Sequence, residues 1–327
     1  ASTLDDLLQK VFRALLRSRD KIRPSKGDAV EIRGALLTLS NPRARLSNTE
    51  TKGTIFSCLG ELLWYLGGRS DVGSIQYYLK RYADSAEPDG SVNGAYGPRF
   101  FSLNGINQIE NINSILKKED SRQAVIQLFS ASDIDKKYKD VPCTCSLQFF
   151  RRGGKLDLMV HMRSNDAFVG LPHDIFAFTM LQEIIARTSD LKLGVYYHSV
   201  GSLHLYDDTR QGAREYLDEG YQEPIEMPPM PNGDPWAEIG DVLRIEEALR
   251  LDKVSDLPVM SPYWQDLTNL LRIFSLTRGK SHMSRPELRR VANIKSSMSS
   301  QIYAQYIRKR EKPPVPSELP LLRMGET

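Results

Sequence analysis

The chain has 327 residues, and its 44 Lys and Arg nearly balance its 41 Asp and Glu, so the net charge of +3 predicts no nucleic-acid-binding surface. No apolar run approaches the ~20 residues of a membrane span and no basic segment followed by an apolar stretch opens the chain, so we expect a soluble, cytoplasmic protein without a membrane partner. Its three cysteines are too few for a disulfide scaffold and no Cys/His spacing is typical of a zinc site, so we expect no metal.

The N-terminal part contains two segments with apolar residues at helical spacing. Residues 4–17 predict an amphipathic helix, and residues 54–66 predict a buried helix that ends at a pair of glycines. Glu61 is the one acid in the second run. Burial of a carboxylate is costly unless its pKa rises or it finds a partner, which suits a group that carries protons. Residues 84–97 are rich in Asp, Ser, Gly and Pro, which predicts a loop.

The centre of the chain has the alternating pattern of β-strands. Residues 145–152 and 155–163 predict two strands joined by a tight turn at Gly153-Gly154, and residues 193–206 predict a third strand. Between them, apolar residues at helical spacing predict a helix that starts after Pro172.

After about residue 240 the patterns are helical, with connections rich in Arg, Lys and Pro. We therefore predict a catalytic domain over residues 1–257 and a helical C-terminal extension over residues 258–327. The sequence contains no internal repeat and no Gly-rich nucleotide-binding loop.

Short motifs follow one another through the first two-thirds of the chain. They are Glu61-Leu62-Leu63-Trp64, Tyr96-Gly97, Ser121-Arg122, Val141-Pro142-Cys143, Gln148-Phe149, Arg163-Ser164-Asn165-Asp166, Gly170-Leu171-Pro172 and His204-Leu205-Tyr206. In order and spacing this set resembles the thymidylate synthase and pyrimidine nucleotide hydroxymethylase family. The resemblance implies an α+β fold with a large mixed β-sheet flanked by helices, and a homodimer whose sheets pack back to back. It also implies that 5,10-methylenetetrahydrofolate donates the one-carbon unit to a pyrimidine nucleoside monophosphate.

The chemistry of this family needs a thiolate, because C5 of a pyrimidine becomes nucleophilic only after addition at C6. Cys143 matches the family's nucleophile, and a thiol with an unperturbed pKa of ~8.5 needs nearby positive charge to ionise at neutral pH. We expect Arg163 to supply that charge from a neighbouring strand. The alternative for Cys143 is a small buried residue. Packing is the expected role of Cys58 and of Cys145, although alternation places Cys145 on the strand face of Cys143.

The resemblance also assigns proton transfer. Glu61 matches the acid that orders water and relays protons around the base and the departing folate, and Tyr96 matches a tyrosine of the same network. Gln148 matches a residue that packs near the nucleotide. Structural alternatives are a hydrogen bond from the backbone to Glu61 and a place in the core for Tyr96.

Convergent guanidinium groups bind a phosphate in a two-pronged geometry. Arg163 matches the family's phosphate-binding arginine, with Ser164 beside it as a hydroxyl donor. Arg122 matches an arginine that the other subunit contributes, so each site would depend on dimerisation; Gln123 stands where a second arginine is usual. Arg23 matches the arginine of the N-terminal loop if an insertion is allowed. Any of these arginines could instead be a solvated surface residue.

Sugar and folate contacts complete the resemblance. His204 and Tyr206, which share a strand face by alternation, match a pair that hydrogen-bonds the sugar hydroxyl. Asp166 matches the carboxylate that binds the pterin amino group. Tyr82 falls where a tryptophan usually borders the reactive methylene, and Gly170 belongs to the same folate-binding motif.

Asp174 is the most informative departure from the synthases, which have asparagine there. An asparagine amide reads O4 and N3–H of uracil, whereas a protonated carboxyl group can donate to N3 of cytosine and accept from its amino group. Sharing that proton with N3 would also make C6 more electrophilic, so Asp174 is expected to take part in catalysis. The structural alternative is an acid that satisfies free N–H groups at a helix N-terminus.

Two further departures concern water. Thr144 stands where synthases usually have histidine and His173 where they usually have phenylalanine, and the C-terminal segment that closes over folate is not recognisable. A wetter site favours addition of water over hydride, so we predict a cytidylate 5-hydroxymethylase acting on CMP or dCMP. One alternative is a thymidylate synthase acting on dUMP. Another is a catalytically silent nucleotide- or nucleic-acid-binding protein on the same fold, with the basic extension as its interaction module.

Overall fold

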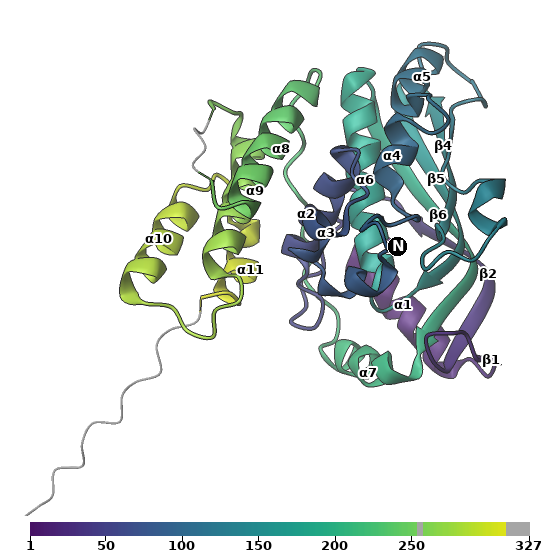
Figure 1. The fold of residues 1–327 in the computed structure, drawn as a ribbon, viewed down its shortest axis with the longest axis horizontal. Coiled ribbons are helices and arrows are strands. Elements are labelled where there is room, and N and C mark those ends of the chain that lie inside the picture. Colours follow the sequence, from purple (N-terminus) through teal and green to yellow (C-terminus); the bar gives the residue numbers. More distant parts are fainter. Residues whose placement is uncertain (254–257, 312–327) are drawn as a thin grey trace, which may run out of the picture.

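The computed structural model describes residues 1–253 and 258–311, which form a six-stranded sheet with helices against one face (Figure 1). The strands are β1 (Lys21–Ile22), β2 (Ala29–Leu39), β3 (Val125–Gln127), β4 (Thr144–Arg152), β5 (Lys155–Asp166) and β6 (Lys192–Tyr206). The helices are α1 (Leu4–Arg17), α2 (Ile55–Leu66), α3 (Val72–Gln76), α4 (Tyr96–Phe101), α5 (Gln108–Ile115), α6 (Gly170–Thr188), α7 (Arg210–Asp218), α8 (Trp236–Arg250), α9 (Pro262–Thr277), α10 (Arg285–Ser296) and α11 (Ala304–Arg308). Short 3-10 helices are η1 (Lys80–Ser85), η2 (Ala131–Ile134), η3 (Asp207–Thr209) and η4 (Gln301–Tyr303).

The sheet has the strand order β1-β2-β6-β5-β4-β3. Neighbouring strands are antiparallel except β5 and β6, which are parallel. A parallel pair needs a long crossover connection, and α6 provides it. The expected α+β fold with a mixed sheet is therefore confirmed.

The predicted elements agree with the observed ones to within a few residues, and the differences have local causes. Gly153 and Gly154, with φ of 54° and 71°, form the turn between β4 and β5, which requires positive φ at both positions. Helix α6 begins at Gly170 rather than after Pro172, because a proline in the first helical turn lacks an N–H that would be unpaired there anyway. The predicted loop over residues 84–97 is interrupted at its end by the start of α4.

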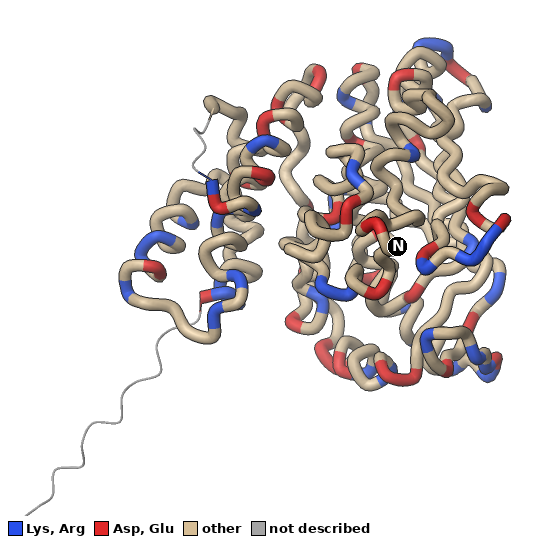
Figure 2. Tube along the Cα trace, viewed as in Figure 1, with Lys and Arg blue, Asp and Glu red and all other residues tan. Residues whose placement is uncertain are grey.

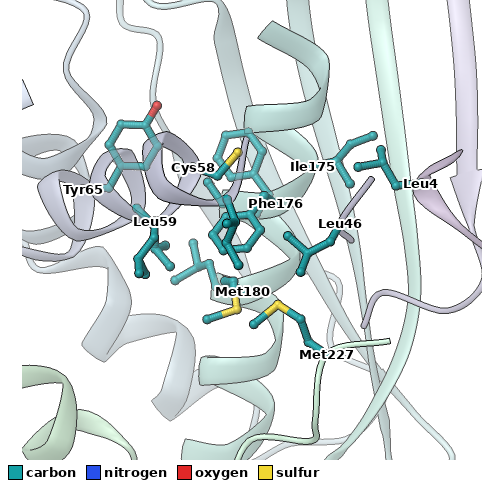
Figure 3. Packing of buried hydrophobic residues seen from close by; sticks show 14 of the residues in the cluster. Leu4, Leu46, Cys58, Leu59, Tyr65, Ile175, Phe176, Met180 and Met227 are labelled. Atoms are coloured by element: carbon teal, nitrogen blue, oxygen red, sulfur yellow. The ribbon is translucent and has the colours of Figure 1, made fainter. Parts of the chain in front are cut away.

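The hydrophobic core lies between the sheet and the helices α1, α2 and α6. Figure 3 shows Cys58 and Leu59 of α2 beside Phe176 and Met180 of α6, and all four side chains are buried. Burial of a side chain of this size contributes about 1.5–3 kcal/mol. The core therefore fixes α2 against α6, and these are the helices that carry Glu61 and Asp174.

The helices α8 to α11 gather on the side of α2 and α3 away from the sheet (Figure 1). Phe274 of α9 stacks on Phe56 of α2 with ring centroids 6.0 Å apart, and the Tyr306 hydroxyl donates to the carbonyl oxygen of Ser47 at 2.7 Å. Helix α8 precedes the proposed boundary at residue 257 but packs against α9. The division at that residue stays a prediction.

Charge is unevenly distributed between the two parts. Residues 278–327 carry eleven Lys and Arg against four Glu, and basic positions recur along α10 and around α11 in Figure 2.

The other face of the sheet has no described helix against it, and Leu36 on β2 is 60% exposed. No helix within residues 1–253 and 258–311 is long and apolar enough to cross a membrane.

Candidate active site

The thiol of Cys143 lies at the start of β4, opposite Arg163 of β5. A bulge between Thr144 and Ser146 adds a residue to β4, so that the backbone N–H of Arg163 donates to the carbonyl oxygen of Cys143 at 2.8 Å. The bulge interrupts the alternation along β4. A shared strand face for Cys143 and Cys145 therefore no longer follows from their spacing.

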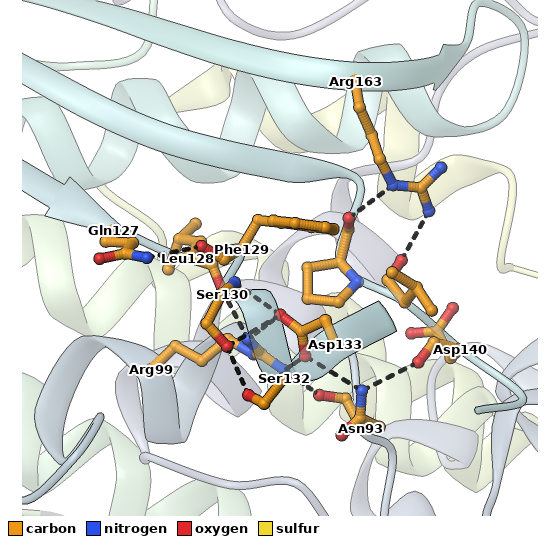
Figure 4. A network of polar contacts seen from close by, with 12 residues as sticks. Asn93, Arg99, Gln127, Leu128, Phe129, Ser130, Ser132, Asp133, Asp140 and Arg163 are labelled. Atoms are coloured by element: carbon orange, nitrogen blue, oxygen red, sulfur yellow. Dashed lines mark hydrogen bonds and ion pairs between the residues drawn. The ribbon is translucent and has the colours of Figure 1, made fainter. Parts of the chain in front are cut away.

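The guanidinium of Arg163 holds the turn that carries the thiol (Figure 4). Its Nε donates to the carbonyl oxygen of Pro142 and its Nη2 to that of Val141, both at 2.9 Å. The same Nη2 lies 3.7 Å from Sγ of Cys143. Nη1 makes no hydrogen bond with the described residues, so it can bind a ligand.

Burial has the largest effect on the ionisation of Cys143. It raises the pKa of the thiol to about 11, because the lowering by Arg163 and Lys26 is smaller, and Asp174 and Asp140 add to the rise. The role of Arg163 in ionising the thiol at neutral pH therefore stays a prediction. The guanidinium acts in the expected direction, but desolvation of a buried thiolate outweighs it.

An ion pair between Arg99 and Asp133 anchors the segment that leads to Cys143. Arg99 of α4 donates to both carboxylate oxygens of Asp133, at 2.6 and 2.8 Å (Figure 4). Asn93 donates to Oδ1 of Asp133 and to the carbonyl oxygen of Asp140, both at 3.3 Å. A bidentate pair of this kind is specific in geometry. It fixes α4, and hence Tyr96, relative to the nucleophile.

Tyr96 reaches β4 beside Cys143. Its hydroxyl oxygen accepts hydrogen bonds from the backbone N–H of Thr144 at 3.1 Å and from Oγ1 of Thr144 at 2.8 Å. Burial holds the pKa of Tyr96 well above its usual value, so the hydroxyl stays protonated. Its own hydrogen makes no bond with the described residues and can serve a ligand.

Glu61 of α2 forms a buried ion pair with His173 of α6. Nδ1 of His173 lies 2.8 Å from Oε2 of Glu61, and the Tyr82 hydroxyl donates to Oε1 at 2.5 Å. Burial alone would raise the pKa of Glu61, but the charge and hydrogen bond of His173 outweigh it and hold this pKa well below its usual range. Burial would lower the pKa of His173, but Cys58 and Glu61 raise it. A buried carboxylate was expected either to have a raised pKa or to find a partner. Glu61 has found a partner, His173, and its pKa is lowered.

Asp174, unlike Glu61, has a raised pKa. Burial, and after it the charge of Glu61, raise the pKa of Asp174 to about 7, although Nδ2 of Asn165 donates to its Oδ2 at 2.6 Å. Gly170 leaves room for this pair, because an added Cβ would lie 3.2 Å from Nδ2 of Asn165 and 3.5 Å from Oδ2 of Asp174. Near neutral pH the carboxyl is thus partly protonated, so it can donate as well as accept.

The residues expected at sugar and folate lie beside these groups. The rings of His204 and Tyr206 have centroids 4.9 Å apart on one face of β6, as alternation predicted. Asp166 pairs with His204 in the register of β5 and β6. Burial, followed by Asp166 and Cys143, raises the pKa of Tyr206, which places this hydroxyl within electrostatic reach of the nucleophile.

Three expected nucleotide contacts lie outside this cluster. Arg23 is 88% exposed and lies 3.8 Å from Asp28, and Arg122 is exposed. Gln148 donates to the backbone carbonyl of Arg122 at 3.1 Å, and none of the three contacts Cys143. Because Arg122 was expected to act across a subunit interface, its role and that of its neighbours stay predictions.

Sequence reasoning missed several groups near the site. Lys26 lowers the pKa of Cys143 from the loop that also carries Arg23. Lys52 has Nζ 3.1 Å from the centroid of the Phe168 ring, and burial lowers its pKa to about 8. Lysines in loops are usually solvated, so their sequence positions gave no signal.

Among the described residues, no group of three or more His, Cys, Asp or Glu side chains could hold a metal.

Comparison with known proteins agrees with this geometry. A family model described as thymidylate synthase matches residues 6–232. The deoxyuridylate hydroxymethyltransferase of Bacillus phage SP01 is 29% identical over 251 residues. That alignment covers 72% of this chain and 66% of the phage protein, so the chain spans slightly less than two thirds of this relative's length.

Proposed function

Because this chain belongs to the thymidylate synthase family, we propose that it transfers a one-carbon unit to C5 of a cytidylate, CMP or dCMP, and releases the 5-hydroxymethyl nucleotide. The family supports one-carbon transfer to a pyrimidine nucleotide. The name of the phage relative supports a hydroxymethylated product. The choice of base rests on the surroundings of Asp174.

Cys143 is the proposed nucleophile. Its thiolate forms a bond to C6, and the C5=C6 electron pair moves to C5, which then bonds the one-carbon unit. The thiol must first lose its proton, and Arg163 at 3.7 Å and Lys26 are the cations that favour the thiolate. Loss of the C5 proton would break the C–N bond to tetrahydrofolate, which leaves as the amine, and a methylene group double-bonded to C5 would remain. Hydroxide from water would then add to this methylene carbon, the C5=C6 bond would re-form, and the Sγ–C6 bond would break to regenerate the thiolate. A thiol placed among such groups argues against a catalytically silent protein.

Glu61 is the proposed acceptor of the C5 proton. An ionised carboxylate is needed for this step, and the ion pair with His173 at 2.8 Å keeps Glu61 ionised. The hydroxyl of Tyr82 fixes the other carboxylate oxygen. Tyr96, bonded to Thr144, is positioned to order water with its free hydroxyl hydrogen.

Asp174 carries the assignment of cytosine. A carboxyl with a pKa raised to about 7 is partly protonated at neutral pH, whereas an ordinary Asp would be almost fully ionised. The protonated form can donate to N3 of cytosine and accept from its 4-amino group. An ionised Asp could only accept, and N3 of cytosine needs a donor. The raised pKa is thus the single observation on which the base depends.

The residues present fit 5,10-methylenetetrahydrofolate, which supplies a carbon at the oxidation level of formaldehyde. Asp166 accepts from the N–H groups of Phe168 and Val169 through Oδ1, at 2.8 and 3.1 Å, and its Oδ2 makes no hydrogen bond with the described residues. That oxygen can accept from the pterin amino group. Tyr82 and Gly170 are the other residues proposed to line the folate site.

The phosphate and the second subunit complete the proposal. Arg163, through its free Nη1, and Ser164 would bind the phosphate within one subunit, and Arg122 of a second copy would add a guanidinium. The sheet face without a described helix, with Leu36 60% exposed, supports a homodimer formed through that face. Arg23, Gln148, His204 and Tyr206 are proposed as further nucleotide contacts.

The test is to incubate the protein with methylenetetrahydrofolate and, separately, CMP, dCMP, UMP and dUMP. We expect a hydroxymethylated product by mass from a cytidylate, without the absorbance rise of dihydrofolate. Dihydrofolate with a methylated product would identify a thymidylate synthase instead. No product from any nucleotide, with Cys143→Ser as the matched inactive control, would overturn the enzymatic proposal.

A second candidate is hydroxymethylation of a uridylate, which the name of the phage relative favours. Asp174→Asn distinguishes the two, because an amide can satisfy O4 and N3–H of uracil together. We expect the variant to lose its preference for cytidylate by a factor of ten or more, since each mismatched buried polar contact costs ~1–3 kcal/mol. Preference for uridylate in the wild type would establish the second candidate.

A further inference from the structure

A chain of buried hydrogen bonds leads from β6 to Asp174. The Tyr196 hydroxyl lies 2.7 Å from Nδ1 of His198, and Nε2 of His198 lies 3.2 Å from Oδ1 of Asn165. Asn165 then donates through Nδ2 to Oδ2 of Asp174 at 2.6 Å. Tyr196, His198 and Asn165 are buried, whereas Asp174 keeps partial exposure. Asp174 is thus the end of the chain that a ligand can reach.

The hydrogen bonds of this chain have one direction. Among the described residues Nδ1 of His198 is the one hydrogen-bond partner of the buried Tyr196 hydroxyl, so we assign the hydroxyl as the donor and Nδ1 as an acceptor without a hydrogen. Burial lowers the pKa of His198 to about 3, so the ring is neutral and its one hydrogen sits on Nε2. Nε2–H therefore donates to Oδ1 of Asn165, which orients the amide with its NH2 group toward Asp174.

This direction decides where a proton on Asp174 can sit. Oδ2 already accepts from Asn165, and the carbonyl oxygen of a protonated carboxyl group is a stronger acceptor than its O–H oxygen, so this hydrogen bond favours Oδ2 as the oxygen without the proton. The proton is therefore placed on Oδ1. Along its edge the carboxyl group then presents a donor and an acceptor in a fixed order.

Cytosine and uracil differ in just this order. Cytosine presents an acceptor at N3 and a donor at C4, and uracil presents a donor at N3 and an acceptor at C4. A carboxyl whose proton could move between its oxygens would satisfy either base. We infer that Tyr196, His198 and Asn165 are positioning residues that hold the proton on Oδ1 of Asp174 and thereby make the site discriminate between the two bases. The inference rests on the proposed role of Asp174 in reading the base.

Tyr196→Phe tests this chain at its far end, where the substitution touches no substrate. Without the hydroxyl, Nδ1 of His198 can carry the hydrogen, so the ring and then the Asn165 amide can reverse. We expect the ratio of kcat/KM for cytidylate over uridylate to fall by about tenfold, the worth of one buried hydrogen bond. The fall should come from a relative gain on uridylate, which a merely damaged site would not produce.

Tyr197→Phe is the matched control. It removes the same hydroxyl from the next residue of β6, whose half-buried side chain points to the opposite sheet face. We expect the base ratio to stay at the wild-type value. If thermal unfolding measurements show that Tyr196→Phe is not folded, Asn165→Ala takes its place. This variant removes the donor to Oδ2 and should lower the base ratio in the same way.

A second measurement does not depend on turnover. 15N NMR of histidine-labelled protein reports the tautomer of His198, with His198→Gln used to assign the signal. Hydrogen on Nε2 in the wild type, together with a loss of base discrimination in Tyr196→Phe, supports the inference. Hydrogen on Nδ1, or an unchanged base ratio in a folded variant, overturns it. A wild type that prefers uridylate refutes the proposed substrate instead. In that case the measured tautomer of His198 still tests the direction of the hydrogen bonds from Tyr196 to Asp174.

Discussion

Removal of His173 should destabilise the protein in a way that depends on pH. Glu61 and His173 are 4% and 5% exposed, and their ion pair is the main reason that Glu61 is ionised. In His173→Phe the carboxylate would keep only the hydrogen bond from Tyr82. Loss of one partner of a buried pair costs about 3–5 kcal/mol, because it leaves a buried charge uncompensated.

The sign of the pH dependence follows from the two pKa shifts. Glu61 has a lowered pKa, so its contribution is present above the unfolded value of ~4.3 and is lost as pH falls through the folded value. His173 has a raised pKa, so its contribution is complete below ~6.5 and is lost as pH rises through the folded value. The pair is therefore most effective between these limits, near pH 6.

Chemical denaturation at pH 6 and pH 4 provides the measurement. In His173→Phe, burial raises the pKa of Glu61. The variant therefore becomes less stable as the pH rises from 4 to 6, whereas the wild type does not. We expect the free energy of unfolding to differ by about 3–5 kcal/mol at pH 6 and by clearly less at pH 4. The double variant with Glu61→Gln should recover part of the loss at pH 6. An equal loss at both pH values would refute an ionised Glu61 held by His173.

Three further predictions concern the nucleophile, the dimer and the packing of the site. Alkylation of Cys143, measured against Cys143→Ser, should accelerate steadily from pH 7 to pH 10 because burial raises its pKa to about 11; a plateau below pH 8 would contradict this. Mixing inactive Cys143→Ser with inactive Arg122→Ala should restore part of the activity if Arg122 crosses the interface, and no recovery after subunit exchange would count against a shared site. Gly170→Ala should lower kcat/KM for cytidylate about tenfold without unfolding the protein, because its Cβ would crowd Asn165 at 3.2 Å; full activity would show that this contact relaxes.

Much of the fold could be predicted because its signals are local. The period of apolar residues gave α1, α2 and α6, and alternation around Gly153-Gly154 gave the hairpin of β4 and β5. The pairing of His204 and Tyr206 on one strand face followed from the same alternation. Periodicity could not predict the bulge in β4, because a single extra residue leaves no pattern of its own. That bulge places Cys143 opposite Arg163.

The chemical state of the site was decided by tertiary structure. Sequence identified Glu61 and Asp174 as the two unusual acids, but it could not tell which of them would keep a proton. Glu61 is ionised because His173, 112 residues away in sequence, comes within 2.8 Å of it. Asp174 is partly protonated because desolvation of its carboxyl, which keeps only partial exposure, and the nearby charge of Glu61 outweigh the hydrogen bond from the Asn165 amide. A pKa depends on distances and burial in three dimensions, so residue identity alone fixes which groups are available and the fold fixes what each of them does.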